Sequence, residues 1–320
     1  MPRQEGLAWR RFGCLLGVWY NAPSTAVSTN QQTHTEADMI QERLDFTKRL
    51  ALEAGRLTLE GHGKCGQMPK DMPDGYDIAT VYDFRTEELV KKRILDEFGE
   101  PVLGEEDGLI GDPQAAERRL WIVDPIDGTF NYQRGLPLYA VSIAFCQDGI
   151  PVCGAIYLPA LNQLFIAAKG SGAFLLDGDA STPVPIQVSQ ERDLPRMVIS
   201  LAGGDLSRLM DACAEAGIPW RSLRLSLCAV SSLAFVASGP MEIFSDTALS
   251  LWDVAAGDII LREAGGPAIV DYQGTPIFPE YVHRRLRLGD TKKFPCIAAS
   301  CPELIEKPMG RLVFTAGLGA

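Results

Sequence analysis

The chain has 320 residues, a formal net charge of −11 and a hydrophobic fraction of 46 %. Its length suggests two domains or one large layered unit. An acidic chain lacks the basic field that a nucleic-acid backbone requires, so we expect a cationic partner such as a divalent metal and no nucleic-acid polymer. The sequence has no run of about 18 apolar residues, so we expect no membrane partner.

Cysteine and histidine usage argues against a zinc site. The eight cysteines form no Cys-x-x-Cys pair, and only three histidines accompany them. In a chain of this length, scattered cysteines indicate buried or free thiols in a reducing compartment rather than a disulfide framework. We therefore expect a cytoplasmic protein.

The N-terminal third alternates between loops and helices. Residues 1–37 contain a short apolar stretch that is weak as a signal peptide, so we predict a disordered extension there. Apolar residues at close to helical spacing then predict a first helix over about 38–60. Glycine, proline and charged residues predict a loop over 61–76, and apolar residues four apart predict a second helix over 87–98.

The remainder of the chain divides into two parts with different patterns of predicted strands and helices. Short segments rich in β-branched and aromatic residues, separated by Asp-Gly, Pro and Lys-Gly pairs, favour an antiparallel sheet; they are 120–123, 139–145, 152–158 and 164–168. Beyond Pro183 strand and helix segments alternate, at 197–200, 206–216, 231–237, 242–244 and 253–264. We therefore predict an α+β half over 38–185, an α/β half over 186–305 and a tail over 306–320.

Four acidic clusters lie where a strand or a loop meets the start of a helix: Asp77 with Asp83, Glu105 with Glu106, Asp124 with Asp127, and Asp253. Mg²⁺ prefers carboxylate, water and phosphate oxygens, so carboxylates without histidine favour magnesium over zinc. Each cluster also has a simpler interpretation, because aspartate is common in turns and at helix N-termini.

The segment 124–129, Asp-Pro-Ile-Asp-Gly-Thr, combines the features expected of a metal- and phosphate-binding turn. An apolar strand ends at Asp124, and Gly128 lets the backbone approach a ligand closely. Backbone N–H groups of Gly128 and Thr129 at a helix start would suit a phosphate. If the two carboxylates point the same way, Asp124 could bridge two cations while Asp127 holds one, as an in-line displacement between two metals requires. The spacing disfavours a calcium loop, and the extra residue between the aspartates disfavours an aspartyl-phosphate enzyme.

Four motifs occur in order along the chain: Asp77-Ile78-Ala79-Thr80 with Asp83, Gly104-Glu105-Glu106, Trp121 through Thr129 followed by Phe130-Asn131-Tyr132, and Trp252 through Gly257 with Glu263 through Gly266. Together they resemble the inositol monophosphatase family, whose superfamily includes fructose bisphosphatases and phosphoadenosine-phosphate nucleotidases. The resemblance covers about 38–305 and implies an αβαβα layered fold.

The resemblance also implies two to three Mg²⁺ ions and a role for each site residue. Glu105, Asp124 and the Ile126 carbonyl would hold the first ion. Asp124, Asp127 and Asp253 would hold the second. Asp83 would support a third ion through water and would hydrogen-bond Thr129. A water oriented by Thr129 and the first metal would attack phosphorus directly, without a phosphoenzyme. Sensitivity to lithium and a homodimer are further expectations from the family.

Substrate choice is the least determined feature. Where close inositol monophosphatases carry a small Gly-Thr-Ala stretch against the sugar ring, this chain has Leu227-Cys228-Ala229, so the resemblance implies a bulkier and less polar pocket. Asp246 falls where those enzymes carry a glutamate, and it could bond a polyol or an amine. The residues expected to contact substrate are Asp127, Gly128, Thr129, Asp246 and Asp253.

The expected reaction is hydrolysis of inositol monophosphate or a related sugar or polyol phosphate. The alternatives are a nucleotidase, a fructose bisphosphatase or a histidinol-phosphate phosphatase on the same scaffold and, more remotely, a non-catalytic metal- or phosphate-binding protein. The basic stretch 283–293 is interpreted as a solvated surface loop, with contact to a second phosphate as the alternative.

Overall fold

The computed structural model describes residues 35–64, 68–69, 78–178, 182–202, 211, 214–215, 217 and 219–305. Asp77, most of the segment 206–216, nearly all of the expected extension over 1–37 and the expected tail over 306–320 lie outside these residues. Among the described residues, no helix combines the length and the apolar character needed to cross a membrane.

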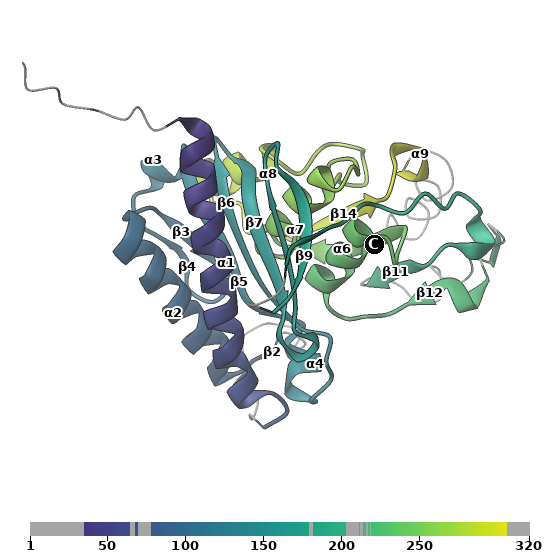
Figure 1. Cartoon of the computed structure of the whole chain (residues 1–320), viewed down its shortest axis with the longest axis horizontal. Coiled ribbons are helices and arrows are strands. Elements are labelled where there is room, and N and C mark those ends of the chain that lie inside the picture. Colours follow the sequence, from purple (N-terminus) through teal and green to yellow (C-terminus); the bar gives the residue numbers. More distant parts are fainter. Residues whose placement is uncertain are drawn as a thin grey trace, which may run out of the picture. The chain divides into compact units, whose positions relative to one another are not determined.

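Figure 1 shows the helices and strands in chain order. The helices are α1 (Glu36–Gly61), α2 (Val81–Phe98), α3 (Pro113–Ala116), α4 (Thr129–Gln133), α6 (Ala229–Ser238), α7 (Leu251–Glu263), α8 (Glu280–Leu288) and α9 (Pro302–Leu304). The strands are β1 (Met68–Pro69), β2 (Ile78–Ala79), β3 (Val102–Gly104), β4 (Gly108–Ile110), β5 (Arg119–Asp127), β6 (Ala140–Gln147), β7 (Ile150–Leu158), β8 (Gln163–Ala168), β9 (Gly172–Asp177), β10 (Val184–Pro185), β11 (Ile199–Ala202), β12 (Leu223–Arg224), β13 (Ile243–Leu249) and β14 (Phe294–Ala299).

Two sheets organise these strands. The larger has the order β10-β9-β8-β7-β6-β5-β3-β4, and the smaller has the order β12-β11-β13-β14. Neighbours in the larger sheet are antiparallel except β3 and β5, which are parallel. The four predicted strand segments become β5 to β8, so the predicted antiparallel sheet is confirmed. In the smaller sheet β11 runs parallel to β12 and β13.

Helices cover both faces of the larger sheet, which gives the expected layered α/β arrangement. α1 and α2 pack on one face, and α7 packs on the other, with α6 between α7 and the smaller sheet. The alternation of side chains along β5 explains how one strand serves two cores. Trp121 and Val123 join the core beneath α1 and α2, whereas Leu120 and Ile122 join the core beneath α7.

Capping residues set where the first two helices begin. Thr35 caps α1, which spans 36–61 against the predicted 38–60. α2 begins six residues before its predicted start, because Thr80 caps it and the Asp83 side chain accepts from the Thr80 backbone N–H in return. Such a reciprocal cap satisfies two backbone donors at once and makes an earlier start favourable.

The basic stretch 283–293 is not a loop throughout, so that part of the interpretation is wrong. Its first half lies in α8, which ends at Gly289 with φ +64. Arginine and leucine are good helix formers, and a left-handed glycine is a common helix terminator. Only residues 289–293 connect α8 to β14.

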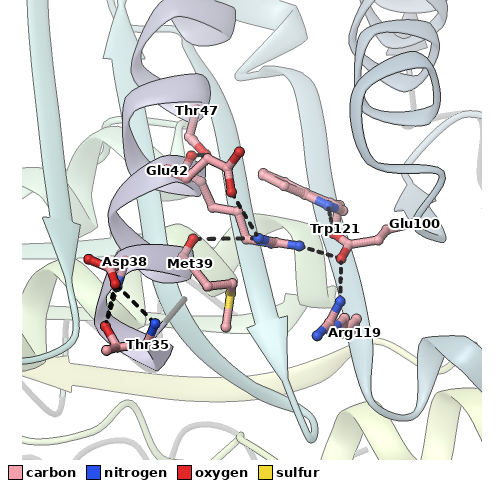
Figure 2. A network of polar contacts seen from close by, with 9 residues as sticks. Thr35, Asp38, Met39, Glu42, Thr47, Glu100, Arg119 and Trp121 are labelled. Carbon is pink, nitrogen blue, oxygen red and sulfur yellow. Dashed lines mark hydrogen bonds and ion pairs between the residues drawn. The ribbon is translucent and has the colours of Figure 1, made fainter. Parts of the chain in front are cut away.

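A buried ion pair joins α1 to Glu100, which lies between α2 and β3 and also contacts β5. Figure 2 shows the polar network around Glu100. Arg43 Nη2 donates to Glu100 Oε1 at 2.5 Å, with only 6 % and 8 % of the two side chains exposed. Trp121 Nε1 donates to the other Glu100 oxygen at 2.9 Å, and Arg119 reaches the first oxygen at 3.4 Å. Breaking this network would leave a buried charge without its partner. The network therefore holds α1 in place against the sheet.

Candidate functional site

An irregularity at the end of β5 brings two of the predicted carboxylates together. In the pairing of β5 with β6, Asp124 lies opposite Ser142 and Asp127 lies opposite Ala140, so β5 contains one extra residue. Residues three apart on a regular strand point to opposite faces, and one inserted residue turns them to the same face. Pro125 lies within this bulge, and Asp124 Oδ1 accepts a hydrogen bond from Ile126 N at 3.0 Å.

The first turn of α7 brings the third carboxylate. Ser250 is the N-cap residue of α7, and its backbone N donates to Asp253 Oδ2 at 2.6 Å. Asp253 therefore acts as a helix-capping residue, as the simpler interpretation held. It also contributes to the cluster, because one carboxylate oxygen from each of Asp124, Asp127 and Asp253 lies within 4.8 Å of the others. The structure thus unites residues more than 120 positions apart.

Asp83 and Thr129 form a second pair at the edge of this cluster. Asp83 Oδ2 accepts from Thr80 N at 2.8 Å and from Thr80 Oγ1 at 2.6 Å. Its other oxygen accepts from Thr129 Oγ1 at 3.1 Å, which is the hydrogen bond expected from the family resemblance. The Ile126 carbonyl lies 3.0 Å from the same hydroxyl. One hydroxyl has one proton, so Thr129 donates to only one of these two acceptors at a time.

The loop before α6 and the first turn of α6 together hold Asp127. Asp127 Oδ2 accepts from Val230 N at 2.7 Å and from Cys228 Sγ at 2.9 Å. Gly128, with φ +83, lies against this loop, and a Cβ there would be 3.0 Å from Cys228 Cβ. Sequence reasoning assigned Cys228 to substrate selection and missed its contact with Asp127. No sequence signal marks that contact, since it depends on how α6 docks.

Glu105 lies in the turn after β3, outside the group of three carboxylates. Its charge nevertheless raises the pKa of Asp83, Asp124, Asp127 and Asp253, so it lies within their electrostatic reach. Glu87 of α2 holds that turn, and sequence reasoning missed it. Its carboxylate accepts from Glu106 N at 2.9 Å and from Asp107 N at 2.8 Å.

Lys91 completes the support of this turn. Its Nζ lies 2.5 Å from Glu87 Oε1, and the side chains of Lys91 and Glu87 are 3 % and 0 % exposed. In the sequence this pair is a glutamate four residues before a lysine on a helix, a spacing that is typical of solvated surface pairs. Burial alone distinguishes it, and burial here follows from the packing of β3 on α2.

The carboxylates form a strongly unfavourable group without a counter-charge. Burial raises the pKa of Asp124 and Asp253 well above the usual range, and neighbouring carboxylates raise them further. Burial also raises the pKa of Asp83 to about 6 and that of Asp127 to about 6, although hydrogen bonds to both lower them. Asp124 Oδ2 is buried and receives no hydrogen bond. An all-oxygen set with an unused buried oxygen fits a hard divalent cation.

The predicted substrate residues lie around this centre. Asp246 on β13 is 9 % exposed, and its charge contributes to the raised pKa of Asp127. Burial raises the pKa of Asp246 itself, while hydrogen bonds and the charge of Lys293 lower it. Leu227 is 53 % exposed and adopts φ +51, the left-handed region that disfavours leucine. The carbonyl oxygen of Ser226, the residue before Leu227, accepts a hydrogen bond from Asn131 Nδ2 at 2.8 Å.

Comparisons with known proteins agree with this arrangement. A model of the inositol monophosphatase family matches residues 39–305. The chain is 31 % identical over 242 residues to the fructose-1,6-bisphosphatase/inositol-1-monophosphatase of Thermotoga maritima, covering 73 % of this chain and 86 % of that one. It is 36 % identical over 237 residues to the histidinol-phosphatase of Mycobacterium tuberculosis, covering 71 % and 87 %.

Another relative carries a different kind of name. The chain is 32 % identical over 244 residues to the Nus factor SuhB of Xylella fastidiosa, covering 74 % and 84 %. Among solved structures, the Thermotoga maritima IMPase superimposes with a TM-score of 0.70 at 27 % identity, over 86 % of this chain and 98 % of that one. Because the family model spans most of the chain, the chain belongs to the inositol monophosphatase family of metal-dependent phosphatases and is a phosphoric monoester hydrolase.

Proposed function

We propose that this chain hydrolyses phosphate monoesters of small metabolites with two to three Mg²⁺ ions. The observation that carries the proposal is the group of three carboxylates, Asp124, Asp127 and Asp253, with oxygens within 4.8 Å of one another. Glu105 and the Ile126 carbonyl would complete the ligand set with Asp124. Mg²⁺ fits best because it takes carboxylate and carbonyl oxygens together with water and phosphate.

Each protein group has a part in the proposed reaction. Bound Mg²⁺ would supply positive charge that stabilises the transferring phosphoryl group and lowers the pKa of a water. Thr129 Oγ1, held by Asp83 at 3.1 Å, would orient that water through an oxygen lone pair. The N–H groups of Gly128 and Thr129 would bind phosphate oxygens, and water would attack phosphorus directly.

The substrate we propose is inositol monophosphate or a related sugar or polyol phosphate. Asp246 is buried near Asp127 and could accept hydrogen bonds from hydroxyl groups. The same carboxylate could bind an amine, and Leu227 offers an apolar contact, so an amine-bearing ester such as histidinol phosphate is the second candidate. The relative named histidinol-phosphatase supports that alternative. Fructose bisphosphate and phosphoadenosine phosphate complete the set to be compared.

Other expectations stay predictions. The described cysteines, Cys146, Cys153, Cys228, Cys296 and Cys301, are free thiols, which supports the predicted reducing, cytoplasmic compartment. Lithium sensitivity and a homodimer rest on the family resemblance. The prediction that the chain has no nucleic-acid partner rests on its acidic charge alone. The relative named Nus factor SuhB gives that prediction no support.

Two substitutions test the proposed site on a generic ester such as phenyl phosphate with saturating Mg²⁺. Asp124→Asn and Thr129→Ala are each expected to lower kcat at least about a hundredfold, because each removes a group that acts on the transition state. Asp96→Asn is the matched control, since Asp96 is 58 % exposed on α2 and forms a surface ion pair with Lys92. Hydrolysis at the wild-type rate by both site variants would contradict the proposal.

The absence of a phosphoenzyme is tested separately. The protein is acid-quenched during turnover of a ³²P-labelled ester, and direct attack by water predicts no label on the denatured chain. Label retained in stoichiometric amount would indicate a covalent intermediate instead. Relative kcat/KM for inositol 1-phosphate, fructose bisphosphate, phosphoadenosine phosphate and histidinol phosphate then ranks the substrate candidates.

A further inference from the structure

A surface pocket lies between α8 and the first turn of α7. It holds about 360 Å³ of empty space, including its open mouth. Basic and aromatic side chains dominate its lining, together with one aspartate: Trp252, Tyr281, Arg284, Arg285, Asp290 and Lys292. A pocket this open suits a small polar group better than an enclosed organic ligand.

The basic side chains of this region differ in how they are compensated. Arg287 lies outside the pocket, and its Nε and Nη2 reach the Glu117 carboxylate at 3.1 and 2.8 Å. Arg284 Nη2 donates to Asp290 Oδ2 at 2.9 Å, and the other Asp290 oxygen accepts from the backbone N of Lys292 at 3.0 Å. The single acidic residue of the pocket is therefore already engaged.

Arg285 and Lys292 form no ion pair within 4.0 Å in the described part of the chain. Arg285 Nη1 donates to the Asp290 carbonyl at 3.5 Å, and the charge of Lys292 contributes to the lowered pKa of Asp290. Three cationic side chains, Arg284, Arg285 and Lys292, thus share one aspartate at this pocket. In a chain of net charge −11, this local excess of positive charge favours an anion.

Aromatic rings hold the guanidinium groups of Arg284 and Arg285 in position before any ligand binds. Arg285 Cζ lies 6.0 Å from the centre of the Trp252 ring, and Arg284 Cζ lies 5.2 Å from that of Tyr281. The Tyr281 ring in turn packs on Phe294 at 4.6 Å. Because a preordered guanidinium loses less freedom when it binds, such an arrangement strengthens recognition of an anion.

We propose that this pocket binds a phosphate group through Arg285 and Lys292. The source is either inorganic phosphate, which the proposed reaction releases, or the phosphate of an organic metabolite. Guanidinium and ammonium groups are the side chains that bind phosphate most strongly. The pocket is separate from the carboxylate centre, which repels anions in the absence of a cation. The two share one element, because Ser250 lines the pocket and its backbone N binds Asp253.

Isothermal titration calorimetry in EDTA tests the proposal. Inorganic phosphate is expected to bind wild-type protein at one saturable site, although no turnover occurs. Arg285→Gln and Lys292→Gln should each weaken binding about tenfold, as expected for loss of one charge-assisted contact. Arg287→Gln is the matched control, with the same change on the same helix but outside the pocket. Tighter binding of glycerol 3-phosphate than of phosphate would identify an organic metabolite as the source.

Three results would overturn the proposal: no saturable binding by wild-type protein, unchanged binding in both Arg285→Gln and Lys292→Gln, or equal weakening by Arg287→Gln. The last result would mean that only net charge matters. Lys292 is exposed, so Lys292→Gln reports on binding even if the half-buried Arg285 proves necessary for folding. The experiment omits Mg²⁺, so it is independent of whether the proposed phosphatase reaction is correct.

Discussion

The turn that carries Glu105 depends on a carboxylate inside α2, and Glu87→Gln tests that dependence. Glu87 binds two backbone N–H groups of the turn, those of Glu106 and Asp107, and it neutralises Lys91. The amide of glutamine keeps one acceptor, places an NH₂ group against the second backbone N–H and removes the charge. The substitution therefore loosens the turn without changing the volume of the side chain.

The structure sets the expected size of the effect. Removing one partner of a buried ion pair costs about 3–5 kcal/mol. Asp107 Oδ2 lies 3.8 Å from Lys91 Nζ but is on a side chain that is 57 % exposed, so it compensates only in part. A loss near the lower end, about 3 kcal/mol, corresponds to a drop in Tm of roughly 5–10 °C. Residues that orient ligands change metal affinity about 10–100-fold, so the Mg²⁺ concentration for half-maximal activity should rise at least about tenfold.

Thermal unfolding and an Mg²⁺ titration of phosphate release measure the two effects. Glu53→Gln is the matched control, because Glu53 also forms an ion pair with a basic residue of α2, Arg93, but at the surface, with 37 % and 49 % of the two side chains exposed. Solvent screens such a pair, so the control should lower the free energy of unfolding much less than Glu87→Gln does. The double variant Glu87→Gln/Lys91→Met should recover much of the lost stability. It should still need the higher Mg²⁺ concentration for half-maximal activity. A Glu87→Gln variant that loses stability and keeps wild-type Mg²⁺ dependence would refute the assigned positioning role.

Three further predictions concern the carboxylates, the loop before α6 and the buried ion pair. Burial raises the pKa of Asp127 to about 6. The protonated Asp127 therefore stabilises the folded, metal-free protein fully below about pH 4, and this stabilisation is lost as the pH rises through about 6. In EDTA, Asp127→Asn should therefore gain stability relative to wild type as pH rises from 4.5 to 7.5, by about 3 kcal/mol at most; a difference in Tm that does not grow with pH would contradict this. Leu227→Gly should raise the free energy of unfolding by up to about 1 kcal/mol, because it relieves the left-handed backbone. Leu225, equally exposed at 53 % and without positive φ, is the control, and a gain from Leu225→Gly in urea unfolding would count against the explanation. Glu100→Gln should cost about 3–5 kcal/mol because it leaves Arg43 buried without its main counter-charge; a change in urea midpoint below that of Glu53→Gln would show that the network is not stabilising.

Periodic patterns and spaced motifs predicted much of the fold and the residues of the candidate site. α1 follows from the helical spacing of apolar residues. Strands β5 to β8 follow from β-branched and aromatic segments separated by turn residues. Asp124, Asp127 and Asp253 were selected by their residue type and position after strands or before a helix. Their convergence within 4.8 Å agrees with that selection.

Features that arise from tertiary packing could not be predicted in this way. The bulge that turns Asp124 and Asp127 to the same face of β5 is visible only in the pairing of β5 with β6. The Glu87–Lys91 pair has the spacing of a surface pair and is buried only because β3 packs on α2. The early start of α2 has a local signal, since Thr80 and Asp83 have capping-box spacing, but the predicted start at 87 rests on apolar spacing alone. Helix α8 was missed because its high charge is typical of solvated loops, although Gly289 marks its end.

The central claim is that the carboxylates of Asp124, Asp127 and Asp253 support hydrolysis only with a divalent cation bound. The most direct measurement is the initial rate of phosphate release from phenyl phosphate as Mg²⁺ is titrated into EDTA-treated protein, with wild type and Asp124→Asn side by side. We predict no release above background without Mg²⁺, a saturable rise in wild type, and a rate at least about a hundredfold lower for Asp124→Asn at every concentration. Release by wild type that is undiminished in EDTA, or equal rates for the two proteins, would contradict the account.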